Sequence, residues 1–185
     1  MYYYLASSLP MLFYETERFP APDAFVELCR QHVAARDYRL LMNASIYNLK
    51  PARPSCRCLE LWRCRETALR NELVKLRTKG RAVEADRYLR DAPVIISVQN
   101  IVRDAFAQDS PLAAEDILNR GRWSYLDELE VGHYFDLDKL LIYSLRLQIL
   151  QRKALFDEQK GLEAFEQLYA TVTSPIYAGS PGGEN

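Results

Sequence analysis

The stretch that decides the fold is Asp136–Phe156, with the sequence DLDKLLIYSLRLQILQRKALF. It contains no Gly or Pro, and Asp136 can accept hydrogen bonds from the N–H groups of a first helical turn. Asp138 would lie in that first turn, where the helix dipole favours an anion. Arg152 and Lys153 would lie near the other end, where the dipole favours cations. We therefore predict one long helix here.

Two polar stripes separate two apolar flanks on this helix when residues are placed at 100° intervals. The stripes are Lys139, Arg146 and Lys153, and roughly opposite them Ser144, Gln148, Gln151 and Arg152. The flanks are Leu140, Tyr143, Leu147 and Leu150, and Ile142, Leu145, Ile149 and Phe156. Because a surface helix has one apolar stripe, two flanks predict a core helix packed between neighbours on both sides.

The composition is that of a globular protein with long helices. The chain has 185 residues, of which 49% are hydrophobic and 26% charged, and only seven are Gly. We predict an all-α fold, an irregular bundle of about seven to nine helices. Residues 1–173 would form one helical domain, or two small helical lobes divided near the Pro-containing loop 48–54. Residues 174–185, rich in Pro and Gly, are predicted to be a disordered tail.

The other helices are predicted from periodicity and end signals. Their ranges are 22–35, 37–44, 55–79, 82–90, 93–106, 112–119, 125–131 and 163–171. Gly121 is expected to break the chain between two of them, with Ser124 and Asp127 acting as a capping box for the second. The aromatic N-terminal segment 2–14 is expected to be buried, either against the core or in a partner.

Residues 55–79 form the longest amphipathic run and place a carboxylate in its apolar seam. The seam consists of Leu59, Trp62, Glu66, Leu69, Leu73 and Leu76. Either Glu66 is a buried group that fixes register or receives a partner's Arg, or it reaches the edge of the helix and pairs locally with Arg70. The outer faces of this run are expected to carry Arg57, Arg63, Arg65, Lys75, Arg77 and Lys79.

Charge is unevenly distributed although the net charge is only −1. Residues 50–90 contain 12 Lys and Arg against 5 Asp and Glu, whereas residues 91–185 contain 8 against 15. Such segregation indicates either two lobes that attract each other or two faces for different partners.

No catalytic, cofactor or metal site is predicted. Cys56, Cys58 and Cys64 lack the spacing of a zinc site, and we expect reduced thiols of a cytosolic protein. The two histidines lie in separate segments, although His133, between acidic residues, is a candidate for a raised pKa. Phosphate-binding loops, nucleotide fingerprints and nucleophile elbows are absent from the sequence. Because the sequence shows no catalytic constellation, we predict that the protein is not an enzyme. No signal peptide or membrane-spanning run is visible either, so we predict a cytoplasmic protein.

Three segments resemble a family of short bacterial proteins encoded among the components of vacuolar/archaeal-type rotary ATPases. They are YYYLASSLPML over 2–12, RETALRNELVKLR over 65–77 and LDELEVGHYFDLDKL over 126–140. The resemblance implies a non-catalytic role like that of the C-type adaptor of the central stalk, which joins the rotor ring to the central shaft in ion transport. It also implies that the chain sits peripherally at the inner membrane through protein partners. At 185 residues it is shorter than the usual adaptor, which has three similar helical lobes.

Two docking surfaces are predicted on this basis, one basic and one acidic. The candidate residues are Arg57, Arg63, Glu66, Arg70 and Arg77, and Glu128, Glu130, His133, Asp136 and Asp138. Two alternatives remain: an assembly factor that visits the ATPase, and a nucleic-acid-binding helical module that uses residues 50–90. Two observations argue against nucleic acid: the net charge of the whole chain is negative, and glutamates are interleaved among the basic residues of that segment.

Overall fold

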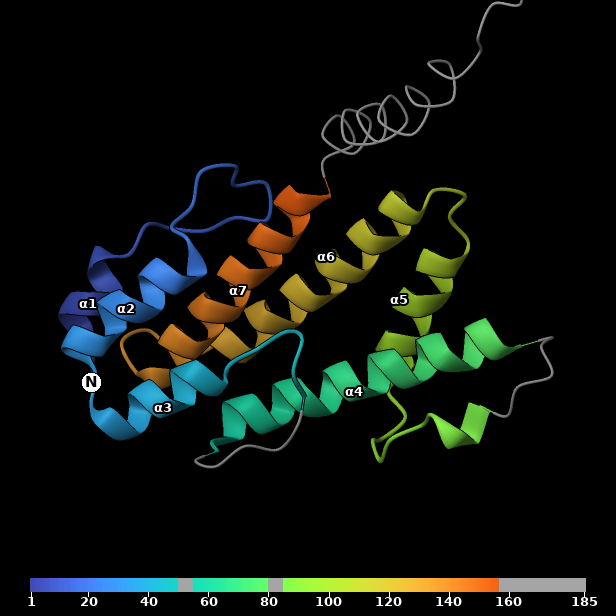
Figure 1. Ribbon diagram of the computed structural model, residues 1–185, viewed down its shortest axis with the longest axis horizontal. Helices are drawn as coiled ribbons and strands as arrows, with labels where there is room; N and C mark the ends of the chain where they lie inside the picture. The colour runs from blue at the N-terminus through green and yellow to red at the C-terminus, as the bar shows by residue number, and fades with distance from the viewer. Residues whose placement is uncertain (50–54, 80–84, 157–185) are drawn as a thin grey trace, which may run out of the picture.

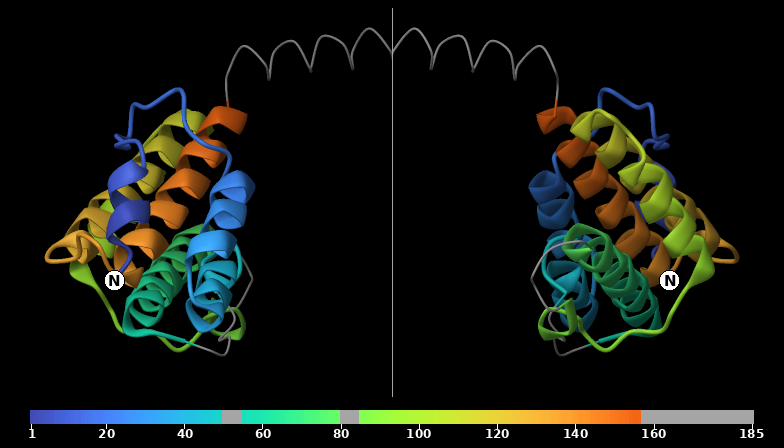
Figure 2. Two further views of the ribbon diagram at one scale, coloured as in Figure 1. Left: turned by 90° about the vertical axis from the view of Figure 1, so that its left-hand side faces the viewer. Right: turned by 90° about the vertical axis from the view of Figure 1, so that its right-hand side faces the viewer.

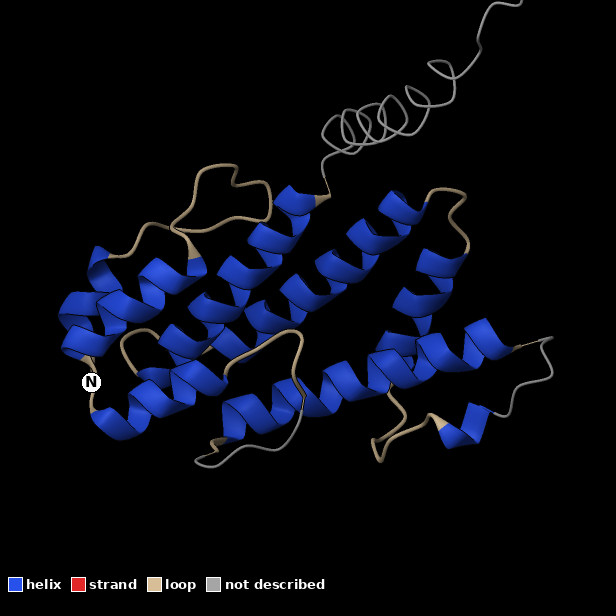
Figure 3. Cartoon of the chain, in the orientation of Figure 1, coloured by secondary structure: helices blue, strands red, loops and turns tan. Residues whose placement is uncertain are grey.

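The computed structural model describes residues 1–49, 55–79 and 85–156, and helices dominate these ranges (Figure 1). The elements are α1 (Tyr3–Ser8), α2 (Pro22–His32), α3 (Ala35–Asn43), α4 (Arg57–Thr78), the 3₁₀ turn η1 (Ala85–Arg87), α5 (Ile96–Phe106), α6 (Pro111–Glu130) and α7 (Leu137–Leu155). No strand occurs in the described ranges (Figure 3), and the prediction of an all-α bundle is confirmed.

Helix α7 is the centre of the larger core, as its two apolar flanks predict. Every residue from 140 to 147 is buried, including Ser144 and Arg146. The end views show α7 between α6 and α2 (Figure 2), and α3 and α4 also contact it. At its start the Asp136 carboxylate accepts a hydrogen bond from the Lys139 N–H at 3.1 Å, so the predicted N-cap is confirmed.

The α3–α4 connection is fastened to α7 by a side chain from one of the predicted polar stripes. The Gln148 side-chain amide donates to the Ala44 carbonyl at 2.8 Å and accepts from the Ile46 N–H at 3.1 Å. Because these two bonds satisfy the side-chain amide of Gln148, the α3–α4 connection can cover this polar side of α7.

A smaller apolar cluster lies where α4, α5 and α6 meet. Its buried members are Leu69, Val98, Val102, Ala105 and Leu118. Helix α6 contributes Leu118 to this cluster and Trp123 and Leu126 to the larger one around α7. One continuous α6 therefore connects the two apolar clusters.

The prediction that Gly121 separates two helices is wrong. Helix α6 runs unbroken through Gly121 to Glu130, and the residues of the predicted capping box lie inside it. The glycine is a packing residue, because a Cβ built there would lie 2.9 Å from Ile101 Cδ1 and 3.0 Å from Ile101 Cγ2. The missing side chain allows α5 and α6 to approach closely, and packing outweighs the weak helix propensity of glycine.

Adding a side chain at position 121 should destabilise the protein. We expect Gly121→Leu to lower the free energy of unfolding by about 2–3 kcal/mol, because the added side chain overpacks the α5–α6 interface. Chemical denaturation followed by circular dichroism measures the change. Adding Ile101→Ala should recover part of the loss, and wild-type stability for Gly121→Leu alone would contradict a close helix approach.

Other predicted boundaries are corrected at the ends of elements. Of the helix predicted over 82–90, only η1 occurs within the described residues 85–90, and α5 begins at Ile96 rather than at residue 93. The predicted helix 163–171 and the predicted tail 174–185 lie outside the described residues. None of the helices in the described ranges is long and apolar enough to cross a bilayer.

The N-terminal segment is only partly buried. Leu5, Ala6, Leu12 and Tyr14 belong to the core, whereas Tyr3, Tyr4, Met11 and Phe13 are exposed. Burial against the core is therefore confirmed for part of the segment, and several of its other apolar side chains lie on the surface.

Candidate functional site

Glu66 is a buried carboxylate held by two arginines. Its side chain is 2% exposed and accepts from Arg70 Nε at 3.2 Å. Arg122 of α6 binds it with two nitrogens, at 3.0 and 3.1 Å. The interpretation that Glu66 reaches the helix edge and pairs only locally is wrong. It receives an Arg, and that Arg comes from another helix of the same chain.

The ion pairs continue from Glu66 across α6 to α7. Arg122 donates to Asn119 at 2.9 Å and to Glu115 at 3.4 Å, and Arg152 of α7 donates to the same Glu115 oxygen at 2.8 Å. Burial acts to lower the pKa of Arg122, but the neighbouring carboxylates of Glu66 and Glu115 outweigh burial and raise it. The network therefore stays charged and ties α4, α6 and α7 together.

A small cavity of about 280 Å³ lies against this network. It is lined by Ile46, Arg70, Leu73, Arg77, Glu115, Leu118, Arg122 and Arg152. Four arginines and one glutamate therefore share the lining of this cavity with the aliphatic residues Ile46, Leu73 and Leu118.

The predicted basic docking surface does not form one face. Arg57 and Arg77 are exposed at opposite ends of α4, about 30 Å apart along the helix axis. Arg63 is only 9% exposed and donates to Ser55 Oγ at 3.3 Å and to the Asn43 carbonyl at 3.4 Å. The expectation that Arg63 lies on an outer face is wrong, because it fixes the α3–α4 junction.

The predicted acidic residues do gather at the turn between α6 and α7, where Gly132 adopts a φ of +86°. Glu130 is engaged inside the protein, since Lys139 binds it and Arg146 Nη2 lies 2.7 Å from it. Burial would raise the pKa of Glu130, but the hydrogen bonds from Lys139 and Arg146 outweigh burial and lower it. Arg146 also binds Asp127 at 2.5 Å.

His133 is part of the same turn and pairs with two aspartates. Its Nδ1 lies 2.5 Å from Asp136 Oδ2, and its Nε2 lies 3.8 Å from Asp138 Oδ2. The hydrogen bond to Asp136 raises the pKa of His133 against a smaller opposing effect of burial. Of the predicted acidic residues, Glu128 is the exposed one, whereas Asp136 both caps α7 and holds His133.

The His133–Asp136 pair should make stability depend on pH. A raised folded-state pKa means that protonated His133 stabilises the fold fully below its unfolded pKa of about 6.5. This contribution is lost as the pH rises through the higher folded pKa. Thermal unfolding between pH 5 and pH 8, in roughly half-unit steps, should therefore show a smaller decline for His133→Gln than for the wild type. An identical decline for His133→Gln and the wild type would contradict this prediction. His32→Gln is the control for loss of an exposed imidazole.

Four aromatic side chains form an exposed cluster at the end of the molecule where α1 meets the α6–α7 turn. This cluster, here called the aromatic tip, consists of Tyr3, Tyr4, Tyr134 and Phe135. The rings of Tyr3 and Phe135 have centroids 4.6 Å apart, and the Tyr2 N–H donates to the Phe135 carbonyl at 2.6 Å. The sequence analysis selected Tyr3 and Tyr4 only as part of segment 2–14 and did not select Tyr134 and Phe135, although the adjacent aromatics at 134–135 were the signal that could have indicated them.

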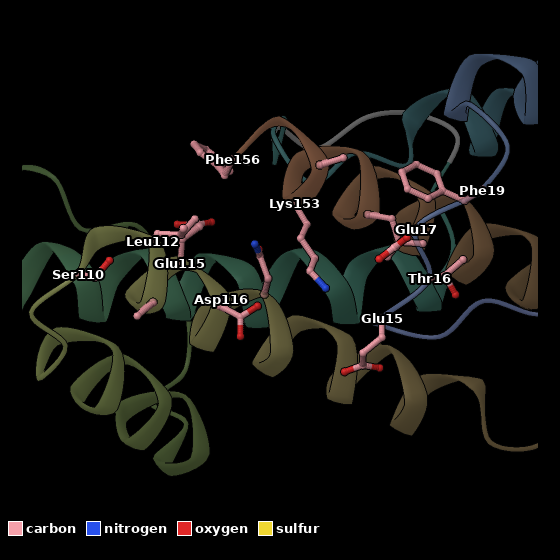
Figure 4. Close-up of a pocket in the computed structure, with 14 residues that line it drawn as sticks. Glu15, Thr16, Glu17, Phe19, Ser110, Leu112, Glu115, Asp116, Lys153 and Phe156 are labelled. Atoms are coloured by element: carbon pink, nitrogen blue, oxygen red, sulfur yellow. The ribbon is translucent and has the colours of Figure 1, made fainter. Parts of the chain in front are cut away.

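A cavity of about 980 Å³ opens between the loop after α1, the first half of α6 and the end of α7. In Figure 4, Lys153 points from α7 into the space between Asp116 and the loop residues Glu15 and Glu17. Lys153 donates to the Tyr14 carbonyl at 3.0 Å, and Asp116 accepts from the Tyr14 hydroxyl at 2.7 Å. These contacts fasten the loop to the helices, so the charged groups have a structural role.

Burial disfavours the thiolate form of Cys29, Cys56 and Cys58. Burial raises the pKa of Cys29 to about 11 and that of Cys58 to about 12. Nucleophilic or metal-binding cysteines need the thiolate form near neutral pH. Within the described ranges no group of three or more His, Cys, Asp or Glu side chains is arranged to hold a metal ion.

One part of the chain is similar to a known protein family. Neither a curated protein nor a solved structure matches the chain. One family does match, over residues 92–176, a segment that contains α5, α6 and α7. Over that segment the chain is similar to the family described as "Protein of unknown function (DUF2764)".

Proposed function

We propose that this protein is a non-catalytic helical subunit that docks onto larger partners through the aromatic tip. The observation that carries the proposal is the exposure of that cluster: Tyr4 is 88% exposed and Tyr134 is 69% exposed. Tyrosine and phenylalanine are enriched at protein interfaces, where large rigid rings bury much area at low entropic cost. Four such rings side by side are a docking surface rather than scattered apolar residues.

The charge around the aromatic tip suggests the chemistry of the partner. Glu128 near the end of α6, and Asp136 and Asp138 at the start of α7, flank the turn that carries Tyr134 and Phe135, and Glu128 has no ion-pair partner in the described part of the chain. Complementary charge at the rim of an interface steers association and fixes orientation. We therefore propose an apolar partner surface bordered by lysine or arginine.

The larger assembly that we propose is a bacterial V/A-type rotary ATPase, with this chain as a C-type adaptor of the central stalk, between rotor ring and shaft. The support is the sequence resemblance of segments 2–12, 65–77 and 126–140. Two of these segments supply the aromatic tip, Tyr3 and Tyr4 from the first and Tyr134 and Phe135 from the last. In this role the protein would be cytoplasmic and peripheral at the inner membrane through the ATPase.

Affinity purification tests this proposal. The tagged full-length protein would be recovered from detergent-solubilised native membranes, and its partners identified by mass spectrometry. We expect rotary ATPase subunits in stoichiometric amount with the wild type and their loss with Tyr4→Ser/Tyr134→Ser. The control is Tyr88→Ser, because Tyr88 is also exposed but directly follows η1, which contacts α4. Trace recovery would favour the assembly-factor hypothesis, and no recovery would reject the ATPase assignment.

The nucleic-acid hypothesis has less support from the geometry. It required residues 50–90 to present a basic face, but Arg63 is buried and Arg70 donates to Glu66 and to the Ile46 and Tyr47 carbonyls. Nucleic-acid affinity that rises steeply as salt is lowered would revive this alternative.

A further inference from the structure

We propose that the cavity between α4, α6 and α7 is an anion site that binds a phosphate group, with Arg77 and Arg152 as its principal ligands. This cavity, here called the arginine cavity, is the one of about 280 Å³ described above. The proposal is independent of the docking function, because the aromatic tip contributes no residue to its lining.

The charge balance of the arginine cavity favours an anion. Arg70, Arg77, Arg122 and Arg152 line it, and the opposing carboxylates are Glu115 in the wall and Glu66 behind it. Four cations against two anions leave an excess of two positive charges in a space partly walled by Ile46, Leu73 and Leu118. That excess of positive charge attracts a dianion.

Two of the four arginines have donors to spare. Arg70 and Arg122 are committed to Glu66 and neighbouring acceptors, so they supply mainly positive potential. Arg77, by contrast, has no hydrogen-bond or ion-pair partner in the described part of the chain. Arg152 uses Nε for Glu115, and its two terminal nitrogens find no acceptor among the described residues. Paired guanidinium N–H groups fit the oxygens of a phosphate.

The size of the cavity selects a compact ligand. Pockets for drug-sized molecules span about 300–1,000 Å³, and the arginine cavity lies just below that range. It has room for inorganic phosphate, for pyrophosphate, or for the phosphate end of a nucleotide whose remainder stays outside. The shared chemistry is the phosphate group, and the experiment distinguishes its sources.

Isothermal titration calorimetry on the full-length protein tests the site, with inorganic phosphate, pyrophosphate and ATP each titrated at constant ionic strength in chloride. We expect saturable 1:1 binding of at least one of the three, and the tightest identifies the source. Arg77→Gln should weaken that binding about tenfold, because one charge-assisted contact is lost. Arg36→Gln is the matched control, an exposed arginine on α3 outside the cavity, and should leave affinity unchanged.

A second variant should change the affinity for the anion in the opposite direction. Glu115→Gln removes the carboxylate of the cavity wall and should tighten binding several-fold, a gain that a general loss of structure cannot produce. Circular dichroism would verify that each variant is folded. Absence of saturable heat for all three ligands overturns the proposal, as does equal affinity for Arg77→Gln and Arg36→Gln.

Discussion

Replacing Glu66 by Ala is expected to lower the free energy of unfolding by about 3–5 kcal/mol. The carboxylate is almost fully buried, and its removal leaves Arg122, whose side chain is 11% exposed, without a bidentate partner. Arg122 would keep only Asn119 and the longer 3.4 Å contact with Glu115, so most of what offsets the desolvation of its buried charge would be lost. Urea denaturation followed by circular dichroism gives the change directly.

The control for this result is Glu27→Ala. Glu27 also pairs with an arginine on its own helix, Arg30 at 3.5 Å, but both side chains are largely exposed. Its loss should change stability by less than about 0.5 kcal/mol. The double variant Glu66→Ala/Arg122→Met should lose less free energy of unfolding than the sum of the losses of the two single variants, because it no longer buries the Arg122 charge. A cost below about 1 kcal/mol for Glu66→Ala would contradict a buried network.

Truncating Leu145 to Ala should have an effect of similar size, about 3–5 kcal/mol. Leu145 lies in the middle of α7 and is completely buried in the larger core. The loss has two parts, the transfer free energy of the removed atoms and the cavity that rigid neighbours leave behind. Thermal and chemical unfolding of the purified variant would measure it.

Leu155 supplies the matched control on the same helix. Its side chain is 74% exposed at the end of α7, so Leu155→Ala should change stability by less than about 0.5 kcal/mol. Equal effects of the two substitutions would show that α7 is not the core helix around which the others pack.

The parts of the fold that the sequence predicted are those encoded by neighbouring residues. Helix α7 has its cap at Asp136, its charges at the ends suited to the dipole and its apolar spacing within one continuous stretch. The Glu66–Arg70 pair was visible for the same reason, because four residues make one helical turn.

The parts that were missed depend on residues distant in the chain. Gly121 was interpreted as a helix end because its packing partner, Ile101, belongs to another helix. Arg122 stands 56 positions from Glu66, and no local pattern joins them. Arg63 looks like its exposed neighbours in sequence, and only the α3–α4 junction explains its burial.

The joining of the two halves of the aromatic tip was missed for a related reason. Tyr3 and Tyr4 come from the N-terminal segment, whereas Tyr134 and Phe135 belong to a turn more than a hundred residues later. Each pair alone is consistent with a buried anchor. The hydrogen bond from the Tyr2 N–H to the Phe135 carbonyl places the two segments side by side, and all four rings are exposed there.

The most direct test of docking through the aromatic tip is site-specific photo-crosslinking in cells. A benzophenone amino acid would replace Tyr134 in one strain and Tyr88 in another, and crosslinked partners would be identified by mass spectrometry. Both positions are well exposed, so they differ in location rather than accessibility. We predict crosslinks to a rotary ATPase subunit from position 134 and none from position 88. Crosslinks to that protein from position 88 alone, or from neither position, would contradict docking through the aromatic tip.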